Sequence, residues 1–268
     1  MKRTQTSEIA LRATKPSAGI REAYYKQLRS LLGDLSTSVA REVKAVYVDY
    51  EPQIAQDAKE PAKHLSDSLE KARKKWDKKF LTASEKLAYW FGRRVKAHVA
   101  RSQKSALQTL ASPISIGFSR GNASEDVLTA IVAENVSLIR SLASQYLTQV
   151  VSDVMQSVQN GRDLKTLAQT LNHRYAVSRR RAQTIARDQN NKATESLARA
   201  NDREAGVQYG IWIHVPGRLS SRDTHKRFDG KKFDLSKGLY DADEGRYVLP
   251  AECINCNCTY RPIFSSKL

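Results

Sequence analysis

Cysteine is scarce in this 268-residue sequence, and the three that are present, Cys253, Cys256 and Cys258, lie within six positions of one another. A framework of disulfide bonds between distant segments is therefore excluded, and the simpler expectation is a reducing compartment. Long apolar runs are also lacking. None approaches the roughly 20 residues that a membrane-spanning helix needs, so no membrane partner is expected. The basic N-terminal residues include no apolar segment, which argues against a secretory signal.

Aromatic residues are sparse, at 7%, and hydrophobic residues make up 40% of the chain. This composition favours extended helices with thin cores. Acidic residues are outnumbered, because 28 Asp and Glu stand against 45 Lys and Arg, which gives a formal net charge of +17 and a sequence pI of about 9.8. Such an excess of positive charge favours polyanions or acidic protein surfaces as partners.

Helical spacing of apolar residues dominates the first 115 residues, after a polar stretch over 1–18 that is predicted to be a flexible tail. Residue types typical of helix ends predict boundaries at Glu51-Pro52, Pro61, Thr82 with Glu85, and Pro113. Two apolar stripes result, formed by Leu28, Leu31, Leu32, Leu35, Val39 and Val43, and by Leu65, Leu69, Ala72, Trp76 and Phe80.

Three more helices are predicted, over residues 124–159, 163–173 and 178–206, with stop signals at Gly161 and Gly206. The apolar spacing of the first slips near Asn135, which indicates a break, and Ser178 is predicted to cap the third. These helices precede the part of the chain that contains every cysteine.

After Gly206 the pattern changes from a helical period to alternation. A half-buried strand is predicted over residues 207–215, and Asp229-Gly230 is typical of a two-residue hairpin turn. The predicted fold class is therefore mainly α with a small C-terminal α+β module. The N-terminal region is extended and helical, and the C-terminal domain contains a β-hairpin and is closed by a cysteine knuckle.

The knuckle has the pattern C-x-x-C-x-C. Closely spaced cysteines can direct two or three sulfurs to one point, and tetrahedral zinc binds thiolate and imidazole ligands. The predicted ligands are His225, Cys253, Cys256 and Cys258, with His214 as the second choice of histidine. The alternative is that the cysteines are small buried hydrophobic residues and that His225 is a hydrogen-bonded loop residue.

A second interpretation of this region is a catalytic cluster. Arg222, Asp223, His225 and Asp229 could act with zinc as a nuclease in which histidine activates water. The spacing matches no recognised nuclease signature, so no catalytic residue is assigned. In the alternative, Asp229 makes the turn while Arg222 and Asp223 form a local ion pair.

Basic residues gather in three groups that could contact nucleic-acid phosphates or an acidic protein surface. Trp76 and Trp90 lie among them, and their place in the apolar stripes predicts core positions rather than base stacking. The basic residues are Lys71, Arg73, Lys74, Lys75, Lys78, Lys79, Arg93, Arg94, Arg179, Arg180 and Arg181.

Several stretches of the second half occur in a recognisable order: ENVSLIRSLASQYLTQV, NGRDLKTLAQTL, RAQTIARDQNNK, QYGIWIHV, RDTHKRFDGKKF and LPAECINCNCTYRPI. Together they resemble the Mu F-like minor head proteins of tailed bacteriophages, also called head morphogenesis proteins. The resemblance supports His225, Cys256 and Cys258 as a set. Asn257 stands where the family usually has arginine, Cys253 is additional, and an aspartate that usually follows Trp212 is missing, so its role cannot be carried over.

The resemblance implies a structural protein of the phage head, without enzymatic activity, that assembles in the host cytoplasm and stays inside the virion. Expected partners are the portal protein, the major capsid protein or scaffold, and double-stranded DNA bound without sequence preference. Residues 121–268 form the expected Mu F-like domain, and residues 19–115, with uncovered apolar stripes, are expected to dock on the portal or capsid. Two alternatives are a zinc-dependent nuclease or toxin-like effector, and a non-specific DNA-binding zinc protein.

Overall fold

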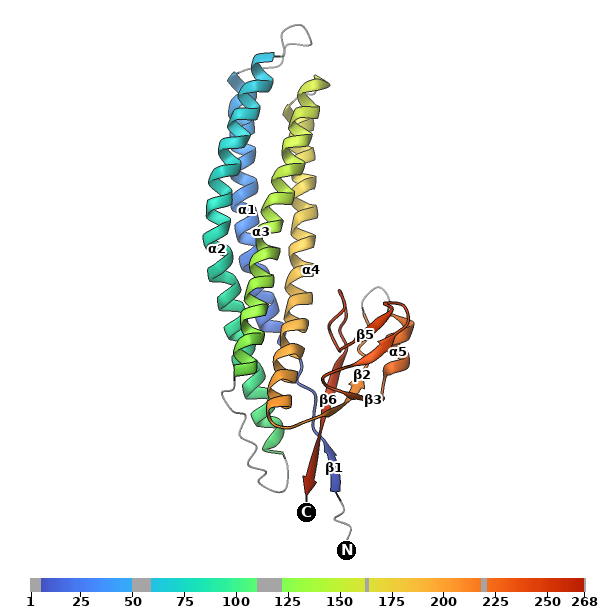
Figure 1. Ribbon diagram of the computed structural model, residues 1–268. Coiled ribbons are helices and arrows are strands. Elements are labelled where there is room, and N and C mark those ends of the chain that lie inside the picture. The colour runs from blue at the N-terminus through green and yellow to red at the C-terminus, as the bar shows by residue number, and fades with distance from the viewer. Residues whose placement is uncertain (1–5, 50–58, 110–121, 162–163, 218–220, 268) are drawn as a thin grey trace, which may run out of the picture. The chain divides into compact units, whose positions relative to one another are not determined.

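The computed structural model describes residues 6–49, 59–109, 122–161, 164–217 and 221–267. In chain order its elements are β1 (Thr6–Ala10), α1 (Ala18–Asp49), α2 (Lys59–Leu107), α3 (Asn122–Gln159), α4 (Leu164–Glu204), β2 (Tyr209–Ile213), α5 (Asp223–Phe228), β3 (Lys232–Asp234), β4 (Leu239–Asp241), β5 (Arg246–Val248) and β6 (Thr259–Lys267) (Figure 1). The predicted fold class, mainly α with a small C-terminal α+β module, is confirmed.

Contacts divide the chain into two units, and each unit combines stretches that are distant in sequence. The bundle unit consists of residues 22–89 and 133–185, and the sheet unit of residues 1–21, 90–132 and 186–268. Helices α2, α3 and α4 therefore contribute residues to both units. This division differs from the predicted one, which separates an N-terminal region ending at residue 115 from a domain beginning at residue 121.

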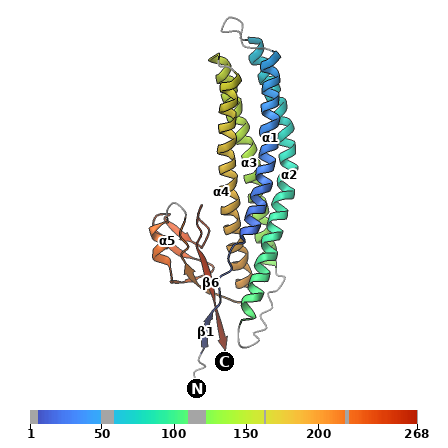
Figure 2. The same ribbon diagram turned by 180° about the vertical axis from the view of Figure 1, so that it is seen from behind.

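In the bundle unit, segments of the four long helices run side by side (Figures 1 and 2). Both predicted N-terminal stripes are buried except for Leu31, which is half-buried. Hydrogen bonds link the helices: the Tyr24 hydroxyl donates to Asn135 Oδ1 at 2.8 Å, and the Tyr146 hydroxyl to Ser36 Oγ at 3.0 Å. The expectation that these stripes lack cover is therefore wrong, because α3 and α4 complete the core. Its buried apolar residues include Leu28, Leu32, Leu35, Val39, Leu69, Trp76, Phe80, Ile139, Leu142, Val150, Leu167 and Leu171.

Three predicted helix breaks do not occur, since α2 runs through Thr82, α3 through Asn135 and α4 through Ser178. Asn135 interrupts the apolar spacing of α3, but its buried side chain accepts the hydrogen bond from Tyr24, so the helix needs no break. The boundaries expected at Glu51-Pro52 and Pro113 lie outside the described residues.

Helix α3 is long and apolar enough, by length and composition alone, to cross a membrane. Its apolar residues also serve the bundle, where Ile139, Leu142, Tyr146 and Val150 are buried. We therefore interpret α3 as a core helix.

The sheet unit contains a four-stranded sheet with strand order β1-β6-β2-β3, together with the two-stranded hairpin β4-β5. Strand β1 pairs antiparallel with β6, from Thr6 opposite Lys267 to Ala10 opposite Ile263. Residues 6–10 are thus a strand and not the flexible tail that the sequence predicts. Leu11 anchors this strand, because its side chain is buried in the core and its N–H donates to the Pro262 carbonyl at 2.9 Å.

Strand β2 buries the face that carries Gly210 and Trp212, while Tyr209 is exposed. A Cβ atom at Gly210 would lie 2.8 Å from Cδ2 of Tyr260, so this position requires a glycine. Trp212 packs edge-on against Phe228 and Phe233, with ring centroids 5.1 and 5.7 Å away. These aromatic contacts explain why Trp212, and not Tyr209, lies on the buried face of β2.

The turn at Asp229-Gly230 connects α5 to β3, and the expected hairpin at this position is wrong. Gly230 has a left-handed φ of 74°, and its N–H donates to the Trp212 carbonyl at 2.9 Å. The β-hairpin of the module is instead β4-β5, in which Leu239 lies opposite Val248.

A buried polar cluster joins α4 to β6 and α2 within the sheet unit. The Thr259 hydroxyl donates to Glu195 at 2.5 Å, the Tyr260 hydroxyl to Asp202 at 2.6 Å, and Gln103 Nε2 to Asp202 at 2.9 Å. Burial raises the pKa of Glu195 to about 8 and that of Asp202 to about 7. The first residues of β6, directly after Cys258, are therefore held by carboxyl groups that favour their protonated form.

Candidate metal centre

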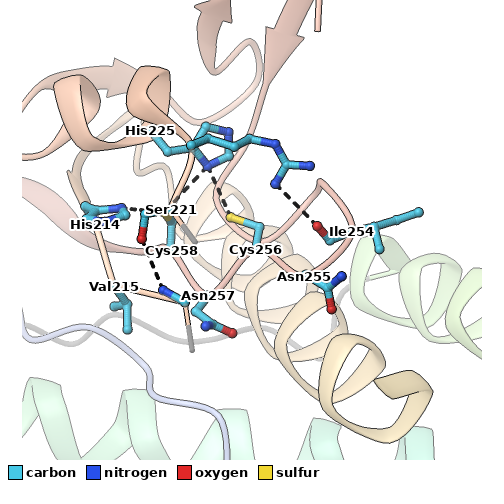
Figure 3. Close-up of a pocket in the computed structure, with 11 residues that line it drawn as sticks. His214, Val215, Ser221, His225, Ile254, Asn255, Cys256, Asn257 and Cys258 are labelled. Atoms are coloured by element: carbon cyan, nitrogen blue, oxygen red, sulfur yellow. Dashed lines mark hydrogen bonds between the residues drawn. The ribbon is translucent and has the colours of Figure 1, made fainter. Parts of the chain in front are cut away.

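Three of the predicted ligands meet at one point in the sheet unit (Figure 3). His225 lies on α5, and Cys256 and Cys258 lie on the loop that precedes β6. The distance from His225 Nδ1 is 3.4 Å to the sulfur of Cys256 and 3.7 Å to the sulfur of Cys258. All three side chains are buried, and their ligand atoms lie within 4.8 Å of one another.

The cysteine loop is folded tightly by two left-handed residues, Ala251 with φ 59° and Asn255 with φ 61°. Within it the N–H of Cys256 donates to the carbonyl of Cys253 at 3.0 Å. Helix α4 holds the loop from outside, because the N–H of Asn255 donates to the Asp188 carboxylate at 2.7 Å. The sulfurs of the loop are thereby directed to one point.

The histidine of the group is oriented by a buried carboxylate. Asp241 of β4 is completely buried, and its Oδ2 lies 3.1 Å from Nε2 of His225. Asp241 is itself fixed, since its Oδ1 accepts the N–H of Asp243 at 3.0 Å. A carboxylate that binds one ring nitrogen of a histidine directs the other nitrogen toward a metal, as in carboxylate–histidine–zinc sites.

The charge state of the group follows from these contacts. Hydrogen bonding with Cys256 and then with His225 outweighs burial and lowers the pKa of Cys258 to about 3. The pKa of Cys256 is raised, because its thiol is hydrogen-bonded to Cys258. Burial alone would lower the pKa of His225, but hydrogen bonds with Cys253 and Cys258 outweigh it and raise this pKa to about 9. These contacts thus favour the thiolate form of Cys258 and the protonated form of His225.

The fourth predicted ligand, Cys253, does not join this group. Among the described residues, the mutually close ligand atoms belong to His225, Cys256 and Cys258. Cys253 is buried in the core of the module, as Cys256 and Cys258 are, and its hydrogen bond with His225 is one cause of the raised pKa of that histidine. His214, the residue after β2, is not a member of this mutually close set either, but its Nδ1 lies 3.5 Å from Sγ of Cys258.

The group faces an open pocket of about 310 Å³ (Figure 3). The pocket is open to solvent and its lining is mainly polar. An ion or a small polar molecule can therefore reach the site. The residues around it are His214, Val215, Gly217, Ser221, Arg222, His225, Ile254, Asn255, Cys256, Asn257 and Cys258.

The residues considered for a catalytic cluster do not converge. Arg222 pairs with Glu244 at 3.4 Å, and Asp223 pairs with Lys226 on the exposed side of α5 at 2.8 Å. The Asp229 carboxylate accepts the N–H of His214 at 2.8 Å and so has a turn-forming role. Arg222 and Asp223 form separate ion pairs, and not the local pair with each other that the sequence predicts.

Asp241 is the residue of the site that sequence reasoning misses. It lies in the acidic and aromatic run between Phe233 and Val248, where nothing in the sequence distinguishes it from Asp243 or Glu244. Its role depends on the fold of β4 against α5, which brings it to a histidine 16 residues earlier in the chain.

The six predicted basic residues between Lys71 and Lys79 of α2 are exposed, but they differ in their partners. Arg73 and Lys74 pair with Glu70, and Lys79 lies over the ring of Trp76. The remaining three form no ion pair with any carboxylate that the structure describes, and their spacing places them on one face of the helix. This lysine row consists of Lys71, Lys75 and Lys78.

The other predicted basic contacts are exposed except for one. Arg93, Arg94, Arg179 and Arg180 face solvent. Arg181 is half-buried and donates to Ser141 Oγ at 2.8 Å, so it serves the bundle rather than a partner surface. Trp76 is buried as predicted, and Trp90 is half-buried beneath Arg94.

In a comparison with known protein families, residues 148–261 match the family described as Phage Mu protein F like protein. A protein of Haemophilus influenzae described only as uncharacterized is 31% identical over 141 residues, which are 52% of this chain and 30% of that protein. The chain thus spans under a third of that relative's length. No solved structure matches. The matched segment contains His214, His225, Cys256 and Cys258. Over residues 148–261 the chain is similar to the Mu F-like family, in agreement with the resemblance that the sequence indicates.

Proposed function

We propose that this chain is a minor head protein of a tailed bacteriophage and acts in head morphogenesis. The observation that carries the proposal is the match of residues 148–261 to the Mu F-like family. The N-terminal helices belong to the same proposal, because α1 and α2 pack in the bundle unit with parts of α3 and α4 that lie inside the matched segment.

The portal protein is the proposed partner, with the major capsid protein or scaffold as further candidates. The apolar stripes of α1 and α2 no longer support docking, because they are buried in the bundle. Docking would instead use polar and basic surfaces. The net charge of +17 favours acidic protein surfaces or polyanions as the partners of such surfaces. The lysine row is the best-defined such surface in the bundle unit.

Packaged double-stranded DNA is the second proposed partner. Exposed lysines on a helix face neutralise phosphates without reading bases, so binding would be independent of sequence and would weaken steeply with salt. Each phosphate contact adds about 0.9 to the slope of log K against log salt, so the lysine row would account for a slope of roughly 2.7. The exposed arginines of α2 and α4 would add to this.

A structural role fits the C-terminal module better than nuclease activity does. Arg222, Asp223 and Asp229 each bind a different local partner, so none of them is directed at a common reacting atom beside His225. A general acid or base must lie within hydrogen-bonding reach of the group it serves. We therefore propose a structural rather than a catalytic role for the chain inside the virion.

The test is head incorporation of charge-reversal variants in a phage that encodes this chain. Changing the lysine row to glutamate should reduce the amount of the protein in purified heads and lower the salt dependence of DNA binding. A matched control changes Lys26, Lys44 and Lys165, which are exposed but scattered over the bundle unit, and it alters net charge equally. Absence of the wild-type protein from purified heads would refute the proposal, and DNA cleavage lost on His225→Ala would favour the nuclease alternative.

A further inference from the structure

The geometry of the cysteine loop points to a further function, which does not depend on the role in the phage head. We propose that His214, His225, Cys256 and Cys258 bind one zinc ion, and that Cys253 is not a ligand. The zinc would be structural. It would join the end of β2, helix α5 and the loop before β6 at one point.

Three nitrogen–sulfur distances fit tetrahedral coordination, two from His225 and one from His214 to Cys258. Zinc bonds of about 2.0–2.1 Å to nitrogen and about 2.3 Å to sulfur, at tetrahedral angles, place a nitrogen and a sulfur about 3.6 Å apart. The three measured distances are 3.4 Å from His225 to Cys256, 3.7 Å from His225 to Cys258, and 3.5 Å from His214 to Cys258. In each of them the nitrogen is Nδ1.

The surroundings of the group supply the outer contacts that metal sites require. Asp241 binds Nε2 of His225 and so leaves Nδ1 directed at the sulfurs. Asp229 accepts the N–H of His214 and fixes the chain at the end of β2. Helix α4 fixes the cysteine loop through Asp188, whose carboxylate accepts the N–H of Asn255. Each element that supplies a ligand is thus held in place by a carboxylate.

The choice of the fourth ligand rests on position. His214 lines the same pocket as the other three residues (Figure 3), whereas Cys253 does not reach this pocket. A set of two sulfurs and two imidazole nitrogens in tetrahedral geometry is typical of zinc.

The first experiment measures metal in the full chain, purified without a chelator. Elemental analysis should find about one zinc per chain, and replacement by cobalt(II) should produce visible bands typical of tetrahedral coordination. Cys253→Ser is the matched control, because it removes a buried thiol of the same loop. It should keep both the stoichiometry and the intensity of the thiolate-to-cobalt charge-transfer band.

Ligand variants should behave differently from this control. Cys256→Ser and Cys258→Ser should each lower the charge-transfer intensity by about half. His214→Ala should keep this intensity but change the visible bands, because water would take the fourth position. Asp241→Asn should weaken zinc binding by about 10–100-fold, the effect typical of an outer-shell partner. Circular dichroism checks folding; if a cysteine variant does not fold, the wild type, Cys253→Ser and His214→Ala decide the outcome.

Two results would overturn the proposal. A wild-type protein without stoichiometric metal, whose three thiols all react in the folded state, would leave no metal site. If Cys253→Ser instead lowered the charge-transfer band and metal affinity while His214→Ala changed neither, Cys253 would be the fourth ligand in place of His214. Neither result would bear on incorporation into heads.

Discussion

The buried carboxyl of Glu195 makes the stability of the sheet unit depend on pH. Its side chain is 2% exposed, and Oε1 accepts a hydrogen bond from Thr259 while Oε2 has no hydrogen-bond partner among the described residues. Burial raises its pKa from 4.5 to about 8. The folded protein therefore holds a proton between about pH 4.5 and 8 that the unfolded chain releases, and the free energy of unfolding must fall as pH rises through this window.

The size of this effect follows from the pKa difference. At about 1.4 kcal/mol for each pKa unit, raising the pKa from 4.5 to about 8 corresponds to at most roughly 5 kcal/mol between the two ends of the window. Asp202, whose pKa burial raises to about 7, adds a decline of the same sign. Glu195→Gln removes only the first contribution, because glutamine keeps an oxygen acceptor for Thr259 and does not titrate. The variant should match the wild type near pH 5 and exceed its stability by a few kcal/mol near pH 8.5.

Urea unfolding at a series of pH values measures the difference. In a Trp76→Phe background, the remaining tryptophans, Trp90 and Trp212, both lie in the sheet unit, so their fluorescence reports on that unit. Asp126→Asn is the control, because Asp126 is an exposed carboxylate of the same unit and its loss should leave the pH dependence unchanged. If the curves of wild type and Glu195→Gln run parallel from pH 5 to 8.5, the carboxyl is ionised throughout and the argument from burial is refuted.

Three further variants test the packing and the surface. Gly210→Ala should destabilise the sheet unit by about 1–3 kcal/mol in urea unfolding, because its Cβ would meet the ring of Tyr260 at 2.8 Å; an unchanged midpoint would contradict this close packing. Leu11→Ala should cost about 2–4 kcal/mol by the same measurement, since Leu11 is 5% exposed in the core, and a neutral result would mean that β1 contributes little. Reversing the charge of the lysine row should lower the slope of DNA affinity against salt by roughly 2.7, whereas an unchanged slope would place the DNA contacts elsewhere.

The helices of this protein are predictable to the extent that they depend on local spacing. Apolar residues three and four positions apart identify the stripes of α1 and α2, and the glycine stops at Gly161 and Gly206 have left-handed φ angles of 58° and 82°. The interruption at Asn135 is different, because its hydrogen-bond partner, Tyr24, lies 111 residues away. A polar residue inside a stripe looks like a break until that distant partner is known.

The metal group is predictable in part for the same reason. The spacing of Cys256 and Cys258 places both sulfurs on one short loop, and His225 is predicted as the histidine ligand and supported by the resemblance. The orienting carboxylate of Asp241 and the approach of His214 depend on how β4 and β2 pack around α5, which no local pattern encodes. The metal itself remains a prediction.

The sheet unit includes residues that lie outside the segment that matches the Mu F-like family. The match begins at residue 148, but β6 pairs with β1, which lies at residues 6–10, and Gln103 of α2 donates to Asp202 in the buried cluster. The sequence predicts residues 121–268 as a separate Mu F-like domain, and such a domain would stay folded after loss of residues 1–110. The structure argues against this, because that deletion would uncover one edge of β6 and would leave Asp202 without one of its two side-chain donors. A fragment that keeps the metal group intact must therefore include β1 and the C-terminal part of α2, and a fragment cut to the matched segment would fail for reasons unrelated to zinc.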